Sequence, residues 1–247
     1  MDTLVVGAGA MGRWLGRTLR EDAPGGVSLA FTDTDAGRAR VAADALECRA
    51  VESDTDESFG AVCVAVPIPA ATGAIATSAA RAERAVFDVT GTMTDPVAAM
   101  REHAPDRERV SLHPLFAPEG EPGNVPVVAD APGPVTDTVR ETLESRGNHL
   151  FETTPAEHDE AMETVQARTH ATILAYALAA EDVPERFHTP VSAGLADLVG
   201  RVTGGEARVY ADIQATFDGA DDVAAAAERV AETDGDAFES LYDEAGR

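Results

Sequence analysis

The chain has 247 residues, enough for two domains, and 44% of them are hydrophobic, which is typical of a folded protein. Its 44 acidic residues outnumber 19 basic residues, all of them arginine, and the formal net charge is −25. Nucleic-acid binding requires a basic face, and none is apparent in the sequence, so we expect no nucleic-acid partner. The acidic residues are spread along the whole chain, which predicts adaptation to high salt, where counterions screen their repulsion. Solubility in ordinary cytosol is the alternative explanation.

The apolar segments are short, and the longest of them fall well below the roughly 18 residues that a membrane span needs. The chain opens directly on a strand-like segment, residues 3–6, without a basic leader, so we expect a cytoplasmic protein without a membrane partner. The spacing of Cys48 and Cys63 is not that of metal ligands, and so small a number of cysteines is consistent with a reducing compartment. We therefore expect no metal site.

The first half of the chain alternates strand-like and helix-like segments. We expect strands at residues 3–6, 27–31, 61–66, 85–89, 109–112, 127–128 and 149–152, and helices at 11–19, 35–46 and 135–145. Repeated strand–helix units of this kind predict an α/β fold: a Rossmann-type, doubly wound, mostly parallel sheet with helices on both faces.

The pattern changes near residue 153, after which no strand is expected. Residues 156–181 carry apolar side chains at helical spacing, Pro184 and Pro190 mark a break, and residues 191–245 are rich in alanine. We therefore expect a Rossmann domain at 1–153 and a smaller all-helical domain at 154–247. Because alanine-rich helices bury little apolar area, the second domain is expected to pair with a twin in a homodimer.

Residues 7–12 form a G-x-G-x-x-G fingerprint between the first expected strand and the first expected helix. Gly7 permits a tight turn, Gly9 lets a diphosphate approach the backbone, and Gly12 lets the helix pack on the strand. The N–H groups that open the helix, near Ala10 and Met11, attract phosphate. This context predicts a dinucleotide site; a purely structural glycine turn is the alternative.

Asp33 ends the second expected strand, 21 residues after Gly12. A carboxylate there accepts hydrogen bonds from ribose hydroxyls and repels a 2′-phosphate, which favours NAD over NADP. Two neighbouring arginines, Arg38 and Arg40, leave NADP open. In the alternative explanation, Asp33 only caps the helix that begins near Asp35.

Several later segments resemble the prephenate dehydrogenase family of tyrosine biosynthesis. They are S-L-H-P-L-F-A-P at 111–118, E-H-D-E-A-M at 157–162 with its continuation to the histidine at 170, L-V-G-R at 198–201, Y-A-D-I at 210–213, and the aspartate and proline at 88 and 96. With the glycine fingerprint they cover nearly the whole chain in order. The resemblance implies hydride transfer from prephenate to NAD with loss of carbon dioxide, giving 4-hydroxyphenylpyruvate.

The resemblance assigns a role to His113, which corresponds to the histidine that hydrogen-bonds the substrate's ring hydroxyl. A neutral imidazole accepts that proton as the carbinol becomes carbonyl-like, and a reference pKa of about 6.5 suits this near neutral pH. The end of a strand is also where doubly wound sheets expose their ligands. Alternatively, His113 is held in its loop by backbone hydrogen bonds alone.

Asp159, Gln166 and His170 share one face of the expected helix because they are seven and four residues apart. Of these, His170 is predicted to act on the substrate and Gln166 to line its site. Asp159 is predicted to bind there or to orient a neighbour; it also suits a helix N-terminus. The resemblance implies that Arg201 binds the substrate carboxylate, to which a guanidinium can donate two parallel hydrogen bonds. Arg168 is a weaker second candidate.

The chain departs from the family after the fourth expected strand. The family often has D-x-x-S-V-K there, with the serine and the lysine near the substrate, whereas this chain has D-V-T-G-T-M at 88–93. Gly91 replaces the serine and Met93 replaces the lysine. Thr90 or Thr92 could supply the hydroxyl, and Thr92 is predicted to contact the substrate. The missing positive charge leaves arogenate as an alternative substrate.

Two other functions remain open at this stage. A small Rossmann reductase of the imine or pyrroline carboxylate type also has a glycine fingerprint and a helical second domain, but it does not explain the histidine at 113 together with the E-H-D segment. A sensor that binds NAD without catalysis is supported by the missing charge at Met93.

Overall fold

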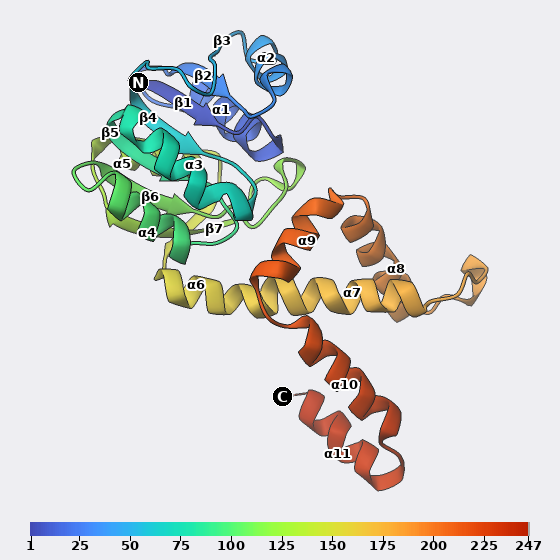
Figure 1. Ribbon diagram of the computed structural model, residues 1–247. Helices are drawn as coiled ribbons and strands as arrows, with labels where there is room; N and C mark the ends of the chain where they lie inside the picture. Colours follow the sequence, from blue (N-terminus) through green and yellow to red (C-terminus); the bar gives the residue numbers. More distant parts are fainter. Residues whose placement is uncertain (247) are drawn as a thin grey trace. The chain divides into compact units, whose positions relative to one another are not determined.

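The computed structural model describes residues 1–246. The chain divides into two compact units, residues 1–159 and the residues from Glu160 onward. The division falls inside helix α6 (Pro155–Met162), six residues beyond the position, 153, at which the sequence pattern changes. Each unit is described separately below (Figure 1).

The first unit is built on one eight-stranded sheet in the order β3-β2-β1-β4-β5-β6-β7-β8. The strands are β1 (Asp2–Val6), β2 (Ser28–Thr32), β3 (Arg49–Ala50), β4 (Phe59–Val64), β5 (Ala82–Asp88), β6 (Glu108–Leu112), β7 (Asn124–Ala131) and β8 (His149–Glu152). Neighbouring strands are parallel except at the β6–β7 pair, which is antiparallel. The strand order reverses between β1 and β4, and doubly wound sheets bind ligands at that point.

Helices cover both faces of the sheet, as the sequence predicts. They are α1 (Ala10–Asp22), α2 (Ala36–Ala45), α3 (Ala71–Ser78), α4 (Thr94–His103) and α5 (Pro134–Ser145), with short 3-10 turns η1 (Ile68–Ala70), η2 (Ala79–Arg81) and η3 (Pro118–Gly120). One core cluster includes Leu15 of α1 and Leu143 of α5, and the other includes Ile75 of α3 and Met100 of α4. The expected elements omit β3, α3 and α4.

The described residues of the second unit form helices joined by loops, without a strand. After α6, the chain forms a π-helical segment η4 (Glu163–Arg168), α7 (Thr169–Ala179), the 3-10 turn η5 (Glu185–Phe187), α8 (Pro190–Thr203), α9 (Ala207–Thr216), α10 (Ala220–Glu232) and α11 (Gly235–Ala245). Figure 1 shows α6, η4 and α7 as one continuous helix. The core is small for so many helices, and large apolar side chains stay exposed, including Leu178 (88%) and Val191 (75%).

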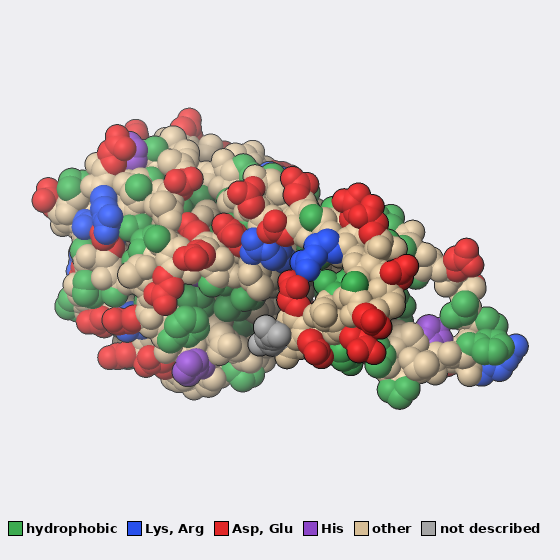
Figure 2. All heavy atoms as spheres, turned by 90° about the horizontal axis from the view of Figure 1, so that it is seen from below, with side chains coloured by type: hydrophobic (Ala, Val, Ile, Leu, Met, Phe, Trp, Pro, Cys, Tyr) green, Lys and Arg blue, Asp and Glu red, His purple; other side chains and the backbone are tan. Residues whose placement is uncertain are grey.

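Among the charged groups of the chain, carboxylates predominate. Figure 2 shows acidic side chains spread over the visible face, with few arginines between them. Within residues 1–246, none of the helices combines the length and the apolar character needed to cross a bilayer.

Candidate active site

The glycine turn after β1 has the geometry that a bound diphosphate requires. Gly7 has φ +103°, and a Cβ added there would collide with the carbonyl of Ala65. A Cβ at Gly12 would collide with the carbonyl of Gly7. Both positions therefore exclude larger residues. Gly9 differs, because a Cβ there would have open space except for a guanidinium nitrogen of Arg38 at 3.7 Å. A bound diphosphate therefore has room to approach the backbone at Gly9.

Helix α1 begins after Gly9, and among the described residues no side chain caps its N-terminus. Its first N–H groups are therefore available to phosphate oxygens. Asp33, at the end of β2, lies beside this turn and accepts a hydrogen bond from the Ala8 N–H at 2.8 Å. The N-cap of α2 is Asp35, which accepts hydrogen bonds from the N–H groups of Gly37 and Arg38. Asp33 accepts from the Asp35 N–H at 2.9 Å, so it supports the turn before the helix and is not itself the cap.

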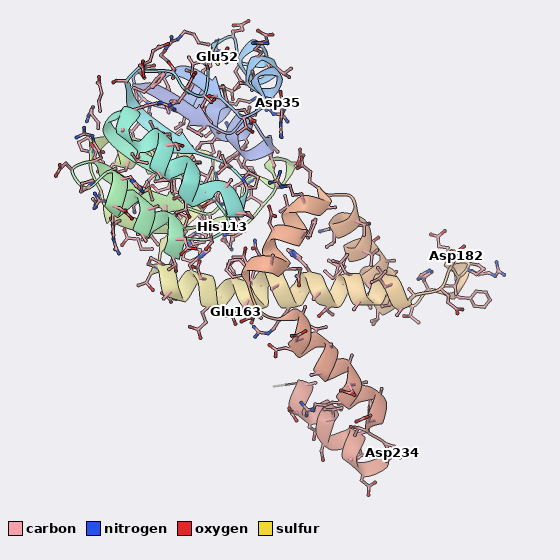
Figure 3. All side chains as sticks on the ribbon, viewed as in Figure 1. Asp35, Glu52, His113, Glu163, Asp182 and Asp234 are labelled. Carbon is pink, nitrogen blue, oxygen red and sulfur yellow. The ribbon has the colours of Figure 1, made fainter. Side chains whose placement is uncertain are left out.

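The neighbouring strands β5 and β6 end at the same edge of the sheet as β1. Asp88 is the last residue of β5 and pairs in register with Ser111 of β6. His113 follows β6 directly, and its N–H donates to the carbonyl of Pro126 at 3.1 Å. Figure 3 labels His113 at this position. Its side chain is 7% exposed.

A chain of three side chains begins at His113. Its Nδ1 lies 2.9 Å from Nε2 of His158, and Nδ1 of His158 lies 2.8 Å from Oδ1 of Asp159. Asp159 also accepts hydrogen bonds from the N–H groups of Met93 and Thr94, both at 3.0 Å, at the start of α4. We call the three residues the Asp159–His158–His113 relay. Within residues 1–246 no group of acidic, histidine or cysteine side chains is placed to hold a metal ion.

The charge state of Asp159 sets the tautomers of both imidazoles. Burial alone would raise the pKa of Asp159, but hydrogen bonds from His158, Thr94 and Met93 outweigh it and hold the pKa at about 2. The carboxylate is therefore ionised and accepts from Nδ1–H of His158. Nε2 of His158 must then accept from Nδ1–H of His113, which leaves Nε2 of His113 as an acceptor.

The imidazole of His113 is neutral at physiological pH. Burial lowers its pKa to about 3, helped by the neighbouring His158 and opposed by Asp159. The value of 6.5 expected from the sequence therefore does not apply, because the folded site removes water from the ring. A neutral ring with a fixed Nε2 acceptor can polarise a donor on a substrate, and it keeps that state over a wide pH range.

A second carboxyl group, that of Asp88, is buried close to the relay. Burial raises its pKa to about 6, although hydrogen bonds from the N–H and hydroxyl of Thr90 lower it. The hydroxyl of Thr90 lies 2.5 Å from Oδ1 of Asp88, and the hydroxyl of Thr92 lies 3.3 Å from Oδ2 of Asp159. Both threonine hydroxyls are thus engaged inside the protein.

Met93 is fully buried in the core cluster that contains Val97 and Met100. Its side chain packs against apolar neighbours in the position where the family often has lysine. The missing positive charge is therefore replaced by a core contact.

The other predicted residues belong to the second unit. The ring of His170, at the start of α7, packs edge-on against Tyr210 with centroids 4.8 Å apart, and burial lowers its pKa. Arg201 of α8 is exposed and forms no ion pair with any described residue. Arg168 instead pairs with Asp222 at 2.7 Å, so its charge is already engaged.

Gln166 lies within the π-helical segment η4. The shared face expected for residues 159, 166 and 170 assumes an uninterrupted α-helix of 3.6 residues per turn. A π-helix has wider turns, with hydrogen bonds from i to i+5, so it shifts the phase of every residue after it. The sequence pattern does not reveal this segment.

Comparison with known proteins identifies the family. The chain is 32% identical over 241 residues to a 4-amino-4-deoxyprephenate dehydrogenase of Streptomyces pristinaespiralis, covering 88% of this chain and 77% of that protein. The chain belongs to the prephenate dehydrogenase family. This family member is therefore an oxidoreductase, as its sequence motifs predict. A search against family models finds no match.

Two solved structures of this family have the same fold as this chain. A prephenate dehydrogenase from Aquifex aeolicus, crystallised with hydroxyphenyl propionate and NAD+, matches with a TM-score of 0.68 at 17% identity, covering 100% of this chain and 95% of that one. A Synechocystis arogenate dehydrogenase matches with a TM-score of 0.59 at 20% identity, covering 87% and 84%. At these identities the likeness shows the fold.

Sequence reasoning missed three features of the site in this family member. It gave no role to His158, because adjacent residues on a helix face different directions, yet His158 links the other two members of the relay. It also missed the buried carboxyl of Asp88 and the position of Ile68, whose Cδ1 would lie 2.9 Å from a Cβ added at Gly91. The histidine–aspartate pair at 158–159 was the available signal.

Proposed function

We propose that this protein oxidatively decarboxylates prephenate, or a close analogue of it, with NAD as hydride acceptor. For prephenate the product is 4-hydroxyphenylpyruvate, a step of tyrosine biosynthesis. The observation that carries the proposal is the Asp159–His158–His113 relay, which holds a neutral imidazole at the end of β6, at the sheet edge that also carries the glycine turn. The family membership supports it, and arogenate or the 4-amino compound named for the Streptomyces relative are the alternative substrates.

A hydride leaves ring carbon C4 of the substrate for NAD+, and the bond from C1 to its carboxylate breaks to release carbon dioxide. The electron pair of that bond completes the aromatic ring. His113 accepts a hydrogen bond from the C4 substituent as the carbon is oxidised, and this acceptor stabilises the positive charge that develops on the heteroatom as the hydride leaves. Since aromatisation drives the reaction, the protein's main task is to position and polarise.

NAD fits the glycine turn. We assign the diphosphate to the backbone of Gly9, Ala10, Met11 and Gly12, where α1 offers its uncapped N–H groups. Asp33 is assigned to the adenosine ribose, since its carboxylate lies beside the turn. Bound NAD supplies the hydride acceptor, and the chain's own residues hold and orient it.

The proposed substrate contacts of the second unit come from His170, Gln166 and Arg201. An exposed arginine without an ion pair is suited to a substrate carboxylate, whereas the paired Arg168 is not. Thr92 and Asp159 already have partners in the protein, so we propose that they position the relay rather than touch the substrate.

The test follows NADH absorbance in molar salt with prephenate, arogenate and 4-amino-4-deoxyprephenate as separate substrates. We expect turnover of at least one of them, and a fall of about 10²- to 10⁴-fold in kcat for His113→Asn. His103→Asn, at the exposed end of α4, is the matched control and should leave kcat unchanged. Tight NAD binding without turnover of any of the three substrates would refute the proposed reaction and favour a sensor that binds NAD without catalysis.

We also propose that the protein is a cytoplasmic, salt-adapted homodimer. The exposed apolar side chains of the second unit, such as Leu178 and Val191, support association with a second copy. The net charge of −25 supports a requirement for salt. Light scattering across 0.1 to 3 M salt tests both points, and a monomer at every concentration would contradict the dimer.

A further inference from the structure

We infer that Arg38, in the first turn of α2, binds the diphosphate of the cofactor through its guanidinium group. The inference rests on the proposed function, which assigns the diphosphate to the backbone around Gly9, and it adds a positively charged side chain to that site. It depends on where the guanidinium lies and on which other groups pair with it.

The first turn of α2 is tied to the glycine turn by a series of hydrogen bonds. The carboxylate of Asp33 accepts from the N–H of Ala8 at 2.8 Å and from the N–H of Asp35 at 2.9 Å. Asp35, which Figure 3 labels, accepts in turn from the N–H of Arg38 at 3.3 Å. The backbone of Arg38 is therefore held beside the glycine turn rather than on a free loop.

The side chain of Arg38 reaches Gly9. A Cβ built on Gly9 would stand 3.7 Å from Nη2 of Arg38, and apart from its chain neighbours it would meet no other described atom within 4 Å. Gly9 is the position at which the fingerprint leaves room for a diphosphate. The guanidinium thus stands on the open side of the glycine turn, where the diphosphate of the cofactor is assigned.

The guanidinium of Arg38 has no carboxylate partner among the described residues. Arg40, two residues later on the same helix, pairs with Glu52 at 3.9 Å. Most other arginines of this unit are paired too, as expected in a chain with 44 acidic and 19 basic residues. Asp33 and Asp35 accept backbone N–H groups and form no ion pair with Arg38. A positive charge without an internal partner is therefore held beside the turn.

A diphosphate at this place is attracted by two positive groups. The uncapped N-terminus of α1 presents N–H groups and a partial positive charge. A guanidinium adds a full charge and can donate two parallel hydrogen bonds to one phosphate group. Because the chain has a net charge of −25, it repels an anionic cofactor, and a local cation offsets that repulsion at the site.

A phosphate on the 2′ position of the ribose is the other anion that Arg38 could bind in a dinucleotide. Two observations favour the diphosphate. The guanidinium lies beside Gly9, which is the diphosphate position of the fingerprint. Asp33, which is assigned to the ribose, repels a 2′-phosphate. We therefore expect Arg38 to act equally on NAD and on NADP, which contain the same diphosphate.

The test measures the Kd for NAD by calorimetric titration of the full-length protein in about 0.3 M and about 2 M salt. We expect Arg38→Gln to raise Kd about tenfold at the lower salt concentration, because it removes a charge-assisted hydrogen bond. The difference should shrink at the higher concentration, since salt screens an exposed guanidinium. Arg40→Gln is the matched control: it removes the same charge from the same helix, and its Kd should stay within about twofold of the wild type.

Two further measurements identify the part of the cofactor that Arg38 binds. Arg38→Lys keeps the charge but loses the planar group, so its Kd for NAD should lie between those of the wild type and of Arg38→Gln. The Kd for NADP should rise in Arg38→Gln by the same factor as the Kd for NAD. A rise confined to NADP would assign Arg38 to the 2′-phosphate and overturn the inference.

The outcomes separate the inference from the proposed function. A wild type that does not bind NAD overturns both. A wild type that binds NAD no more tightly than Arg38→Gln at the lower salt concentration overturns the inference and leaves the proposed function intact. The side chain of Arg38 is exposed, so the variants should fold, and their Tm at each salt concentration checks this. Arg38→Ala gives the same comparison if Arg38→Gln does not fold.

Discussion

Replacing Asp159 with asparagine exchanges one carboxylate oxygen for an NH2 group at the end of the relay. If the amide oxygen keeps the place of Oδ1, it still accepts from His158 and Met93, but the NH2 faces the Thr94 N–H, a donor against a donor at 3.0 Å. If the NH2 takes that place instead, it faces the Met93 N–H and donates to Nδ1 of His158. The second orientation reverses both tautomers and leaves Nε2 of His113 protonated.

The magnitude follows from these two orientations. Each leaves one donor at the start of α4 facing another, which lowers the free energy of unfolding by about 1–3 kcal/mol. A reversed tautomer removes the acceptor from the substrate, and loss of general-base assistance costs about 10²- to 10⁴-fold. We therefore expect kcat to fall within that range while the Kd for NAD stays within threefold.

The assay combines steady-state kinetics with ¹⁵N spectra of the histidine rings, which distinguish a protonated Nε2 from an unprotonated one. Glu108→Gln is the matched control, because that carboxylate accepts from the N–H groups of Val135 and Thr136 at the start of α5. Both N–H groups donate to the same oxygen, Oε2, so the glutamine amide oxygen can keep them, and the control should leave kcat unchanged. A folded Asp159→Asn variant whose ¹⁵N spectra show a protonated Nε2 on His113, and whose kcat is still within threefold of the wild type, would refute the tautomer argument.

Four further outcomes are expected. Gly12→Ala should abolish NAD binding or folding, since its Cβ would collide with the Gly7 carbonyl; calorimetric titration of NAD into a folded variant would contradict this if Kd were unchanged. Asp33→Ala should shift the kcat/KM preference toward NADP, and an unchanged NAD/NADP ratio would count against its assigned role. Arg201→Gln should raise KM about tenfold or more with little change in kcat, and an unaltered KM would exclude it as the carboxylate site. Asp88 has a pKa of about 6 in the folded protein, against a reference value of 3.8, so the folded state binds the proton more tightly than the unfolded state. The free energy of unfolding should therefore fall by about 3 kcal/mol as pH rises from 4 to 6. The stability of Asp88→Asn relative to the wild type should therefore increase over that interval in urea titrations, and a constant difference would show that Asp88 does not titrate there.

Much of the fold follows from local patterns. The glycine fingerprint and the buried apolar runs each report on a few neighbouring residues, so they located seven of the eight strands. Strand β3 has two residues, too few for any periodicity to appear. Helix α3 contains glycine and two threonines in eight residues, which weakens its helical pattern.

The site was harder to predict from the sequence than the fold, because the contacts that build it join residues far apart in the chain. His113 and Asp159 were singled out from motifs, but their connection through His158 spans 45 residues and depends on where α6 begins. The low pKa of His113 arises from burial, which motif spacing does not express. The available hydroxyls at 90 and 92 looked like substitutes for the missing serine until their partners were known.

The first N–H group of helix α4, that of Thr94, donates to the carboxylate of Asp159, a residue 65 positions later in the chain. A nucleotide-binding fragment cut at residue 153, where the composition changes, would lack both that acceptor and His158. Such a fragment should therefore lose more than its substrate half: the start of α4 would fray, and His113 would be free to adopt either tautomer. The first turn of the connecting helix is thus an inseparable piece of the nucleotide-binding half, and dissection of this protein should retain residues through at least 159.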